Sequence, residues 1–137
     1  MTDRSEAEIV ELQCLPEHDS LLTVATCGAQ IPFTVQRAFL VRADADGVKR
    51  GEHAHRRLHQ FLICVSGEIE VIVDDGLQKR RHVLNSVGRG LHVPPGVWAE
   101  QFYRKSGTVL LVLCDAPYDE GDYMRDYNEF AGLRRGM

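Results

Sequence analysis

Long apolar segments are absent from this sequence of 137 residues. No run approaches the roughly 18 consecutive apolar residues that a membrane-spanning helix needs. The first residues, MTDRSEAEIVEL, are acidic and hold no apolar stretch, so they do not resemble a secretory signal peptide. We therefore expect a protein without a membrane or nucleic-acid partner that works in the cytoplasm.

Closely spaced cysteines are also absent. The four cysteines are Cys14, Cys27, Cys64 and Cys114, and no two of them form a C-x-x-C pair. Cys64 and Cys114 lie within apolar runs, where a reduced thiol packs as a small apolar side chain. We expect free thiols in all four cases, because the spacing fits neither a zinc site nor a disulfide framework.

Internal repeats, linkers and low-complexity tracts are missing too, which favours one domain over residues 1–137. The net charge is −4, but residues 37–105 hold 12 basic against 8 acidic residues. A basic middle between acidic ends suits a small anionic ligand better than nucleic acid. Charges scattered over solvated faces would give the same count, so the pattern alone decides little.

The chain consists instead of short apolar runs separated by Gly, Asp, Asn and Pro. In residues 68–73, Ile69, Val71 and Val73 share one face of an alternating strand. Ser66-Gly67 and Asp74-Asp75-Gly76 are turn signals, so 60–84 is expected to form consecutive antiparallel strands. Many short strands with regular turns indicate a β-sandwich or barrel. Strands are expected at 9–15, 21–26, 34–41, 60–65, 68–73, 82–84, 90–93, 98–104 and 108–114.

Only the end of the chain has a helical pattern. Residues 119–133 are rich in charge, and Tyr123, Tyr127 and Phe130 recur at helical spacing. We expect a terminal helix whose aromatic side chains dock onto the barrel and do not contact a ligand.

The segment RGEHAHRRLHQF at 50–61 is the most informative one. His53 and His55 are two residues apart, so on a strand both imidazoles leave the same face. Arg50 and Arg56 flank them. Imidazoles titrate near neutral pH and suit proton transfer. We therefore favour a functional role for His53 and His55 over the alternative that they are only polar residues of a strand. His18, His59, His82 and His92 are expected to be structural.

The same segment resembles the first cupin motif, in which H-x-H precedes a carboxylate and a glycine, here Gly67. GRGLHVPPGVWA at 88–99 resembles the second motif. Metal-binding cupins use both histidines, a glutamate and a second-motif histidine. Gln60 and Ala99 occupy the last two positions here, so the resemblance implies no metal site.

Together RGxHAHR, QFLICVSG, DDG, VPPGVW and PYDExDYxRDYxEF resemble the dTDP-4-keto-6-deoxyglucose 3,4-ketoisomerases, the WxcM-like C-terminal family, over 31–130. The resemblance implies an all-β cupin, a jelly-roll barrel or double-stranded β-helix with a short C-terminal helix. It implies an isomerase that moves a ketone from C4 to C3 of a dTDP-linked 6-deoxyhexose, on the way to 3-amino-3,6-dideoxy sugars. It further implies no metal or organic cofactor, and a homodimer with an exchanged N-terminal strand, here 9–15.

By this resemblance His53 is the base that removes the C–H proton and His55 the shuttle between oxygens, with the reverse order open. Arginines bind phosphates with two hydrogen bonds, and Arg50 is the best candidate, followed by Arg37 and Arg89. Gln60 completes the expected substrate site. The remaining candidate, Trp98, is either a platform for thymine or a buried anchor.

One departure from the family stands out: Phe39 and Leu40 occupy the strand in which members carry tyrosine. Two alternatives follow. A related sugar-nucleotide epimerase resembles this chain less, because such enzymes use a His–Asp pair and a tyrosine acid, and no aspartate has an obvious pairing position. A non-catalytic sugar-nucleotide-binding cupin is the other alternative, and a metal-dependent dioxygenase ranks last.

Overall fold

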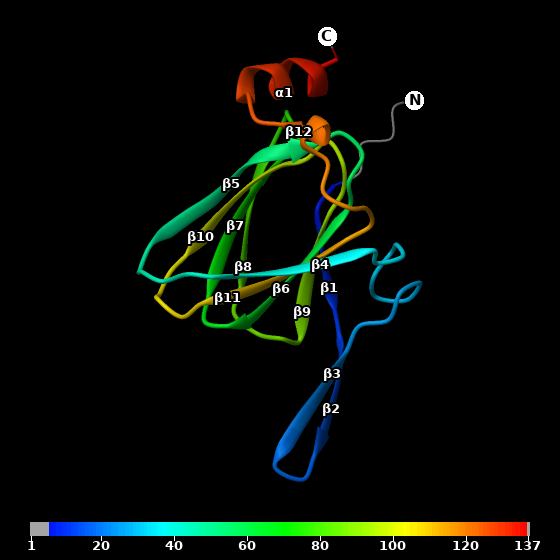
Figure 1. The fold of residues 1–137 in the computed structure, drawn as a ribbon, viewed down its shortest axis with the longest axis vertical. Helices are drawn as coiled ribbons and strands as arrows, with labels where there is room; N and C mark the ends of the chain where they lie inside the picture. The colour runs from blue at the N-terminus through cyan, green and yellow to red at the C-terminus, as the bar shows by residue number, and fades with distance from the viewer. Residues whose placement is uncertain (1–5, 137) are drawn as a thin grey trace.

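Two five-stranded antiparallel sheets face each other in the computed structural model, which describes residues 6–136 (Figure 1). Residues 1–5 and 137 of the expected domain lie outside this part. The sheets form a jelly-roll-like sandwich that does not close fully, which confirms the expected cupin class. The first sheet has the order β1 (Glu8–Glu11), β9 (Arg89–Val93), β6 (Gln60–Ser66), β11 (Val109–Cys114) and β4 (Arg37–Arg42). The second has the order β12 (Tyr123–Met124), β5 (Val48–His55), β10 (Trp98–Tyr103), β7 (Ile69–Asp74) and β8 (Lys79–Leu84).

The core lies between the two sheets and follows the predicted alternation. Ile69, Val71 and Val73 of β7 all point inward and are at most 4% exposed. Leu62 and Val112 pack against them from the first sheet. The intervening side chains of β7 are more exposed, as expected for a sheet with one buried face.

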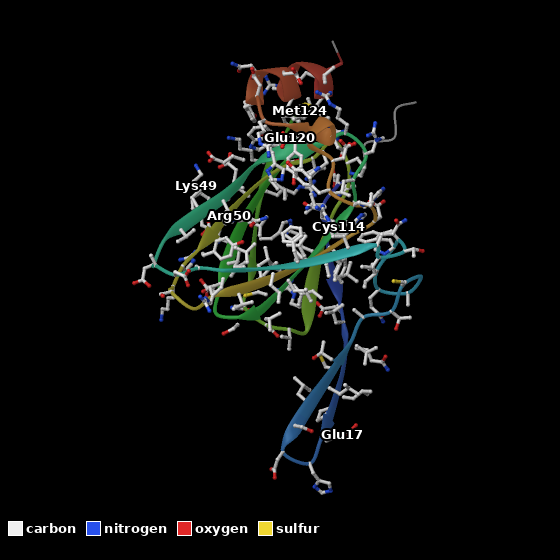
Figure 2. All side chains as sticks on the ribbon, viewed as in Figure 1. Glu17, Lys49, Arg50, Cys114, Glu120 and Met124 are labelled. Carbon is white, nitrogen blue, oxygen red and sulfur yellow. The ribbon has the colours of Figure 1, made fainter. Side chains whose placement is uncertain are left out.

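The N-terminal strand differs from the prediction. The expected strand 9–15 is broken at the buried Leu12, whose backbone N–H bonds to the carbonyl of Gly88. Its first half, β1, pairs with β9 of the same chain. Its second half belongs to a separate hairpin, β2 (Gln13–Glu17) and β3 (Ser20–Val24), which stands away from the sandwich with Glu17 near its tip (Figures 1 and 2).

The predicted helix 119–133 is wrong in its first half. A 3-10 turn η1 (Glu120–Asp122) leads into β12, and only α1 (Tyr127–Arg134) is α-helical. Each helical piece begins at its own aspartate cap: Asp119 accepts from one backbone N–H and Asp126 from two. Two successive caps divide the segment, and the residues between them pair with β5. No helix in the described part of the chain is long and apolar enough to span a bilayer.

Candidate active site

The H-x-H motif follows a bulge in β5. Pairing with β10 passes over Glu52, and both Gly51 and Glu52 have positive φ, 91° and 61°. Side chains alternate along a regular strand, so residues 50 and 53 would face opposite sides without this additional residue. With it, Arg50 and His53 line the same cavity. The bulge therefore joins the predicted arginine to the predicted histidines.

Three cavities border the motif: two adjoin each other, and a third of about 260 Å³ lies between His55 and the side chains of α1. The inner cavity, about 250 Å³, is lined by polar groups of both sheets and by an apolar wall from β4 and β11. The tail cavity, about 230 Å³, lies between the H-x-H strand and the segment 115–123. Arg37 and Tyr123 line both cavities. The polar lining of the inner cavity is Arg37, Arg50, His53, Gln60, Gln101 and Tyr123, and its apolar wall is Phe39, Val41 and Val112.

The two imidazoles lie edge to face, with ring centroids 4.9 Å apart. His53 Nδ1 is 3.1 Å from the carbonyl oxygen of Gly51, and His55 Nδ1 is 3.2 Å from Asp122 Oδ2. A carbonyl and a carboxylate only accept hydrogen bonds, so each Nδ1 carries the proton of its neutral ring. In both rings the basic lone pair is then on Nε2. His55 Nε2 is buried and has no hydrogen-bond partner among the described residues.

Burial favours the neutral form of both rings. It lowers the pKa of His53, with smaller contributions from nearby Arg125 and Arg50. It lowers the pKa of His55 to about 4, helped by His53 and opposed by Asp122. Neutral imidazoles with a free lone pair can act as bases.

Asp122 was missed by the sequence-based reasoning, which found no aspartate in a pairing position. The structure corrects this point, because Asp122 from η1 contacts His55 across 67 positions of sequence. Only the DY step of the quoted PYDExDY motif hinted at it.

Tyr123 has a role different from the docking predicted for it. Its ring centroid lies 4.4 Å from that of His55 and 4.9 Å from that of His53. The Arg125 guanidinium also lies over the Tyr123 ring, 4.2 Å from its centroid. Tyr123 pairs with His55 across β12 and β5, which fixes this position. It is therefore a wall of the site and no part of the helix.

Arg37 and Gln60 meet at the buried thiol of Cys114. Arg37 Nη2 lies 3.5 Å and Gln60 Nε2 3.9 Å from the sulfur. Arg37 also stacks over Phe39 at 5.4 Å, and its buried Nε has no hydrogen-bond partner in the described part of the chain. Figure 2 shows Cys114 and Arg50 on different sheets of the sandwich.

Arg89 and Trp98 lie outside both cavities. Arg89 is on β9 and forms an ion pair with Glu11, 3.5 Å away. Trp98 is 5% exposed, and its indole packs against Tyr127 and Phe130. Of the two readings of Trp98, the structure therefore shows the buried anchor, which holds α1 to the sandwich.

Ion pairs within the folded chain join the basic middle segment to the acidic tail. The acidic tail lies against the basic middle, with Arg56 paired to Glu129 at 2.9 Å and Arg57 to Asp119 at 3.1 Å. The positive excess of residues 37–105 is thus partly neutralised within the molecule. Arg37 and Arg50 are the predicted arginines that face the inner cavity.

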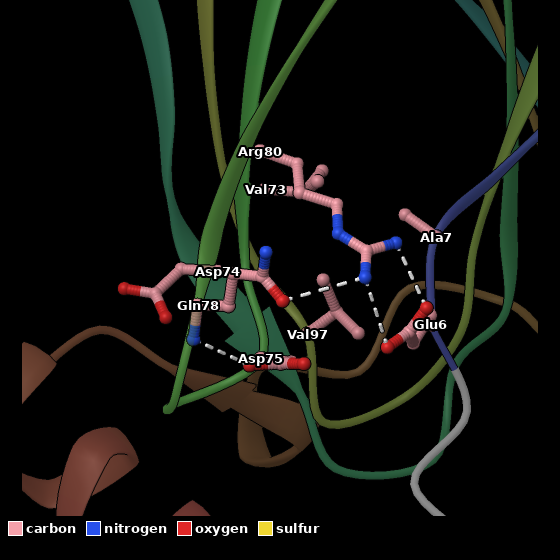
Figure 3. A pocket seen from close by; sticks show the side chains of 8 residues that line it. All are labelled: Glu6, Ala7, Val73, Asp74, Asp75, Gln78, Arg80 and Val97. Carbon is pink, nitrogen blue, oxygen red and sulfur yellow. Dashed lines mark hydrogen bonds and ion pairs between the residues drawn. The ribbon is translucent and has the colours of Figure 1, made fainter.

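Two further polar features of the described residues differ from these cavities. The crevice in Figure 3 holds about 10 Å³, the space of one water molecule, and the Arg80–Glu6 ion pair crosses it at 2.8 Å. His59 and His92 bond to each other at 3.0 Å. Within residues 6–136, no three His, Cys, Asp or Glu side chains are grouped so as to hold a metal ion.

Comparison with known proteins now identifies the family. The model of the WxcM-like, C-terminal (FdtA) family matches residues 5–135. The chain belongs to this family. It is 34% identical over 125 residues to the TDP-4-oxo-6-deoxy-α-D-glucose-3,4-oxoisomerase of Aneurinibacillus thermoaerophilus, covering 91% of this chain and 90% of the relative. The expectation that it is an isomerase is therefore confirmed.

Solved structures of sugar 3,4-ketoisomerases have the same fold. QdtA, a sugar 3,4-ketoisomerase from Thermoanaerobacterium thermosaccharolyticum solved with TDP, superposes with a TM-score of 0.89 at 30% identity over 95% of both chains. A variant of QdtA was solved with TDP-4-keto-6-deoxyglucose. WlaRA, a TDP-fucose-3,4-ketoisomerase from Campylobacter jejuni, matches with a TM-score of 0.88 at 28% identity, covering 95% of this chain and 96% of its own.

Proposed function

We propose that this isomerase moves the ketone of a TDP-linked 4-keto-6-deoxyhexose from C4 to C3. The observation that carries the proposal is the pair of neutral imidazoles, each with its Nε2 lone pair free, beside a cavity with two arginines. The names of the relatives support the substrate class. His53 faces the inner cavity, so we assign it as the base at C3, and His55 as the shuttle between oxygens.

The reaction needs only proton transfers. His53 takes the C3 proton, and the C3–H electron pair forms a C3=C4 double bond, which gives the anion of an enediol. His55 takes the proton from O3 and delivers it to O4. As the C3 ketone forms, C4 receives a proton from His53, whose own proton exchanges with solvent. Each step is a proton transfer that an imidazole can perform, so the proposal includes no metal or organic cofactor.

Two positively charged side chains suit the nucleotide. Arg37 and Arg50 enter the inner cavity from opposite sheets, and guanidinium groups bind phosphate oxygens through charge-assisted hydrogen bonds. Gln60 lines the same cavity, and we propose that it contacts the sugar. The methyl group of a 6-deoxy sugar fits the apolar wall of Phe39, Val41 and Val112.

Further parts of the proposal concern context. We propose a homodimer, a cytoplasmic location, and a place in the synthesis of 3-amino-3,6-dideoxy sugars, which need a C3 ketone as the point of amination. The element available for subunit contact is the hairpin β2–β3, since β1 pairs within its own chain.

The decisive experiment is incubation with TDP-4-keto-6-deoxyglucose in deuterated water, followed by NMR. We expect a C3 ketone with deuterium at C4. Replacing His53→Asn or His55→Asn should lower kcat at least about 100-fold, the usual contribution of general acid–base catalysis, while TDP binding measured by calorimetry persists. His82→Asn, on β8 outside both cavities, is the matched control and should keep full activity.

Other outcomes point to the alternatives. The His55–Asp122 pair gives the epimerase reading an observation in its favour, and an epimer that keeps its ketone at C4 would establish it. Saturable TDP binding without hydrogen exchange at C3 would indicate a non-catalytic binding protein. Full activity of both histidine variants would refute the assigned mechanism.

A further inference from the structure

Asp122 lies behind His55 in an arrangement that does not depend on the imidazole. Its Oδ1 accepts the backbone N–H of Arg57 at 2.8 Å, and its Oδ2 accepts that of Leu58 at 3.1 Å. Its own backbone carbonyl accepts the N–H of Arg56. The side chain is 7% exposed. Fixed backbone donors therefore hold the carboxylate in place before any substrate binds.

His55 completes this arrangement as the third donor. Its Nδ1 is 3.2 Å from Asp122 Oδ2, and its ring is held on the remaining sides by Tyr123 and His53. The buried, unpartnered Nε2 is the ring atom left for the substrate. An imidazole that accepts a proton there becomes a cation in a buried place, which is costly without a compensating anion.

We infer that Asp122 is a positioning residue for this isomerase: it fixes the Nδ1–H tautomer of His55 and stabilises the imidazolium that forms when Nε2 accepts the substrate's proton. This inference rests on the proposed function, in which His55 carries the proton between O3 and O4. The inference also assigns a role to the tail segment 119–124. The pairing of β12 with β5 and the turn η1 hold the Asp122 carboxylate next to the H-x-H motif.

The first test needs no variant and no turnover. The ring nitrogens of His55 in the whole protein are observed by ¹⁵N NMR near pH 7. We expect a protonated Nδ1 and an unprotonated Nε2. The opposite tautomer would overturn the inference even if the protein proved to be an active isomerase. Absence of isomerase activity with the expected tautomer would count against the proposed function alone.

The second test is Asp122→Asn, which keeps the size of the side chain and removes its charge. We expect kcat to fall about 100-fold or more, with KM changed less than about threefold, since the charge acts on a transferred proton and not on substrate binding. The charged and titratable groups that act on or contact His55 are His53, Asp122, Tyr123 and Arg37. The cavities that His55 borders are also lined by the charged groups of Arg56, Arg57, Arg134, Asp115 and Asp119. Asp122 is the carboxylate hydrogen-bonded to His55, so its loss should move the pKa of His55 further down.

A purely structural role predicts the opposite direction. If Asp122→Asn merely loosens the site, His55 gains contact with water and its pKa rises toward the ordinary value of 6.5. A higher pKa of His55 in an NMR titration, or a kcat within threefold of the wild type, would overturn the inference. Asp74→Asn is the matched control: Asp74 is 2% exposed, accepts a hydrogen bond from the Tyr127 hydroxyl, and lines neither the inner nor the tail cavity. It should lower stability and leave kcat unchanged.

Discussion

Phe39 and Leu40 lie in the strand where the resemblance leads us to expect a tyrosine, and they differ in where their side chains lie. The Phe39 ring lines the inner cavity beside Arg37, whereas its neighbour Leu40 is 64% exposed on the other face of β4. The sequence alone left both positions open as the site of the missing tyrosine. Of the two positions, 39 lines the inner cavity and 40 does not.

Phe39→Tyr should therefore raise activity. The added hydroxyl points toward the inner cavity, where it can donate a hydrogen bond to the oxygen that gains charge during enolisation. Hydrogen bonds to charged groups contribute roughly 1.5–3 kcal/mol, so we expect kcat to rise about tenfold or more. Steady-state kinetics on TDP-4-keto-6-deoxyglucose measures this. Leu40→Tyr is the matched control on the outer face, and an equal rate for Phe39→Tyr and wild type would contradict the expectation.

Residue identities in the site were predictable to different degrees. The motif at 50–61 and the resemblance of the chain to cupins allowed five site residues to be named from the sequence. In the structure these residues line the inner cavity or the tail cavity: His53, His55, Arg37, Arg50 and Gln60. The aspartate that bonds to His55 comes from a distant segment. Spacing rules act within one strand or helix, so they cannot predict such a contact.

At the scale of elements, the bulge in β5 is the feature that builds the site. Gly51 has a φ of 91°, and a Cβ atom on it would lie 2.9 Å from the carbonyl oxygen of Ala99. Glycine is therefore needed both for the backbone conformation and for the close approach of β10. A period-two pattern cannot reveal an additional residue in a strand. The sequence therefore named Arg50 as a candidate beside the histidines but could not show that its side chain lines the same cavity as that of His53.

Gly51→Ala should disturb this element specifically. We expect a loss of about 1–3 kcal/mol in the free energy of unfolding from the left-handed conformation. The accompanying shift of β5 should lower kcat by about 100-fold, since displacements near 1 Å at a reacting group have effects of that size. Urea denaturation and steady-state kinetics measure the two effects. Gly107→Ala is the control, because Gly107 has a φ of 87° but no atom within 4 Å of its would-be Cβ. Equal losses of kcat in both variants would show that the clash at Gly51 is unimportant.

The tail shows how far element prediction reaches. The predicted helix is correct for Tyr127 and Phe130, which lie in α1 and pack together against the sandwich. The preceding aromatic residue, Tyr123, lies in the strand β12 instead. The two aspartate caps at Asp119 and Asp126 are visible in the sequence, and only pairing with β5 decides that the first piece stays a single turn. Tertiary contacts thus overrode local periodicity.

At the scale of the whole molecule, the outer part of the hairpin β2–β3 is exposed on a single copy of the described chain. Leu15, Leu21 and Leu22 are 41–54% exposed, and every residue of β2 is exposed. An isolated two-stranded hairpin is at best marginally stable in water, and exposed leucines on it add an unfavourable apolar surface. A second copy of the chain would cover these side chains, which supports the proposed homodimer.

Leu15→Lys combined with Leu22→Lys should therefore separate the subunits. The two leucines are cross-strand partners in the hairpin, so two ammonium groups there would oppose burial in an interface. Light scattering during gel filtration at micromolar concentration should give the dimer mass for the wild type and the 15.4 kDa monomer for the variant. Leu77→Lys, at a leucine 69% exposed in the turn between β7 and β8, controls for added charge and should stay dimeric. A monomeric wild type would end the homodimer proposal, because the exposed leucines of the hairpin would then be tolerated in water without a second copy.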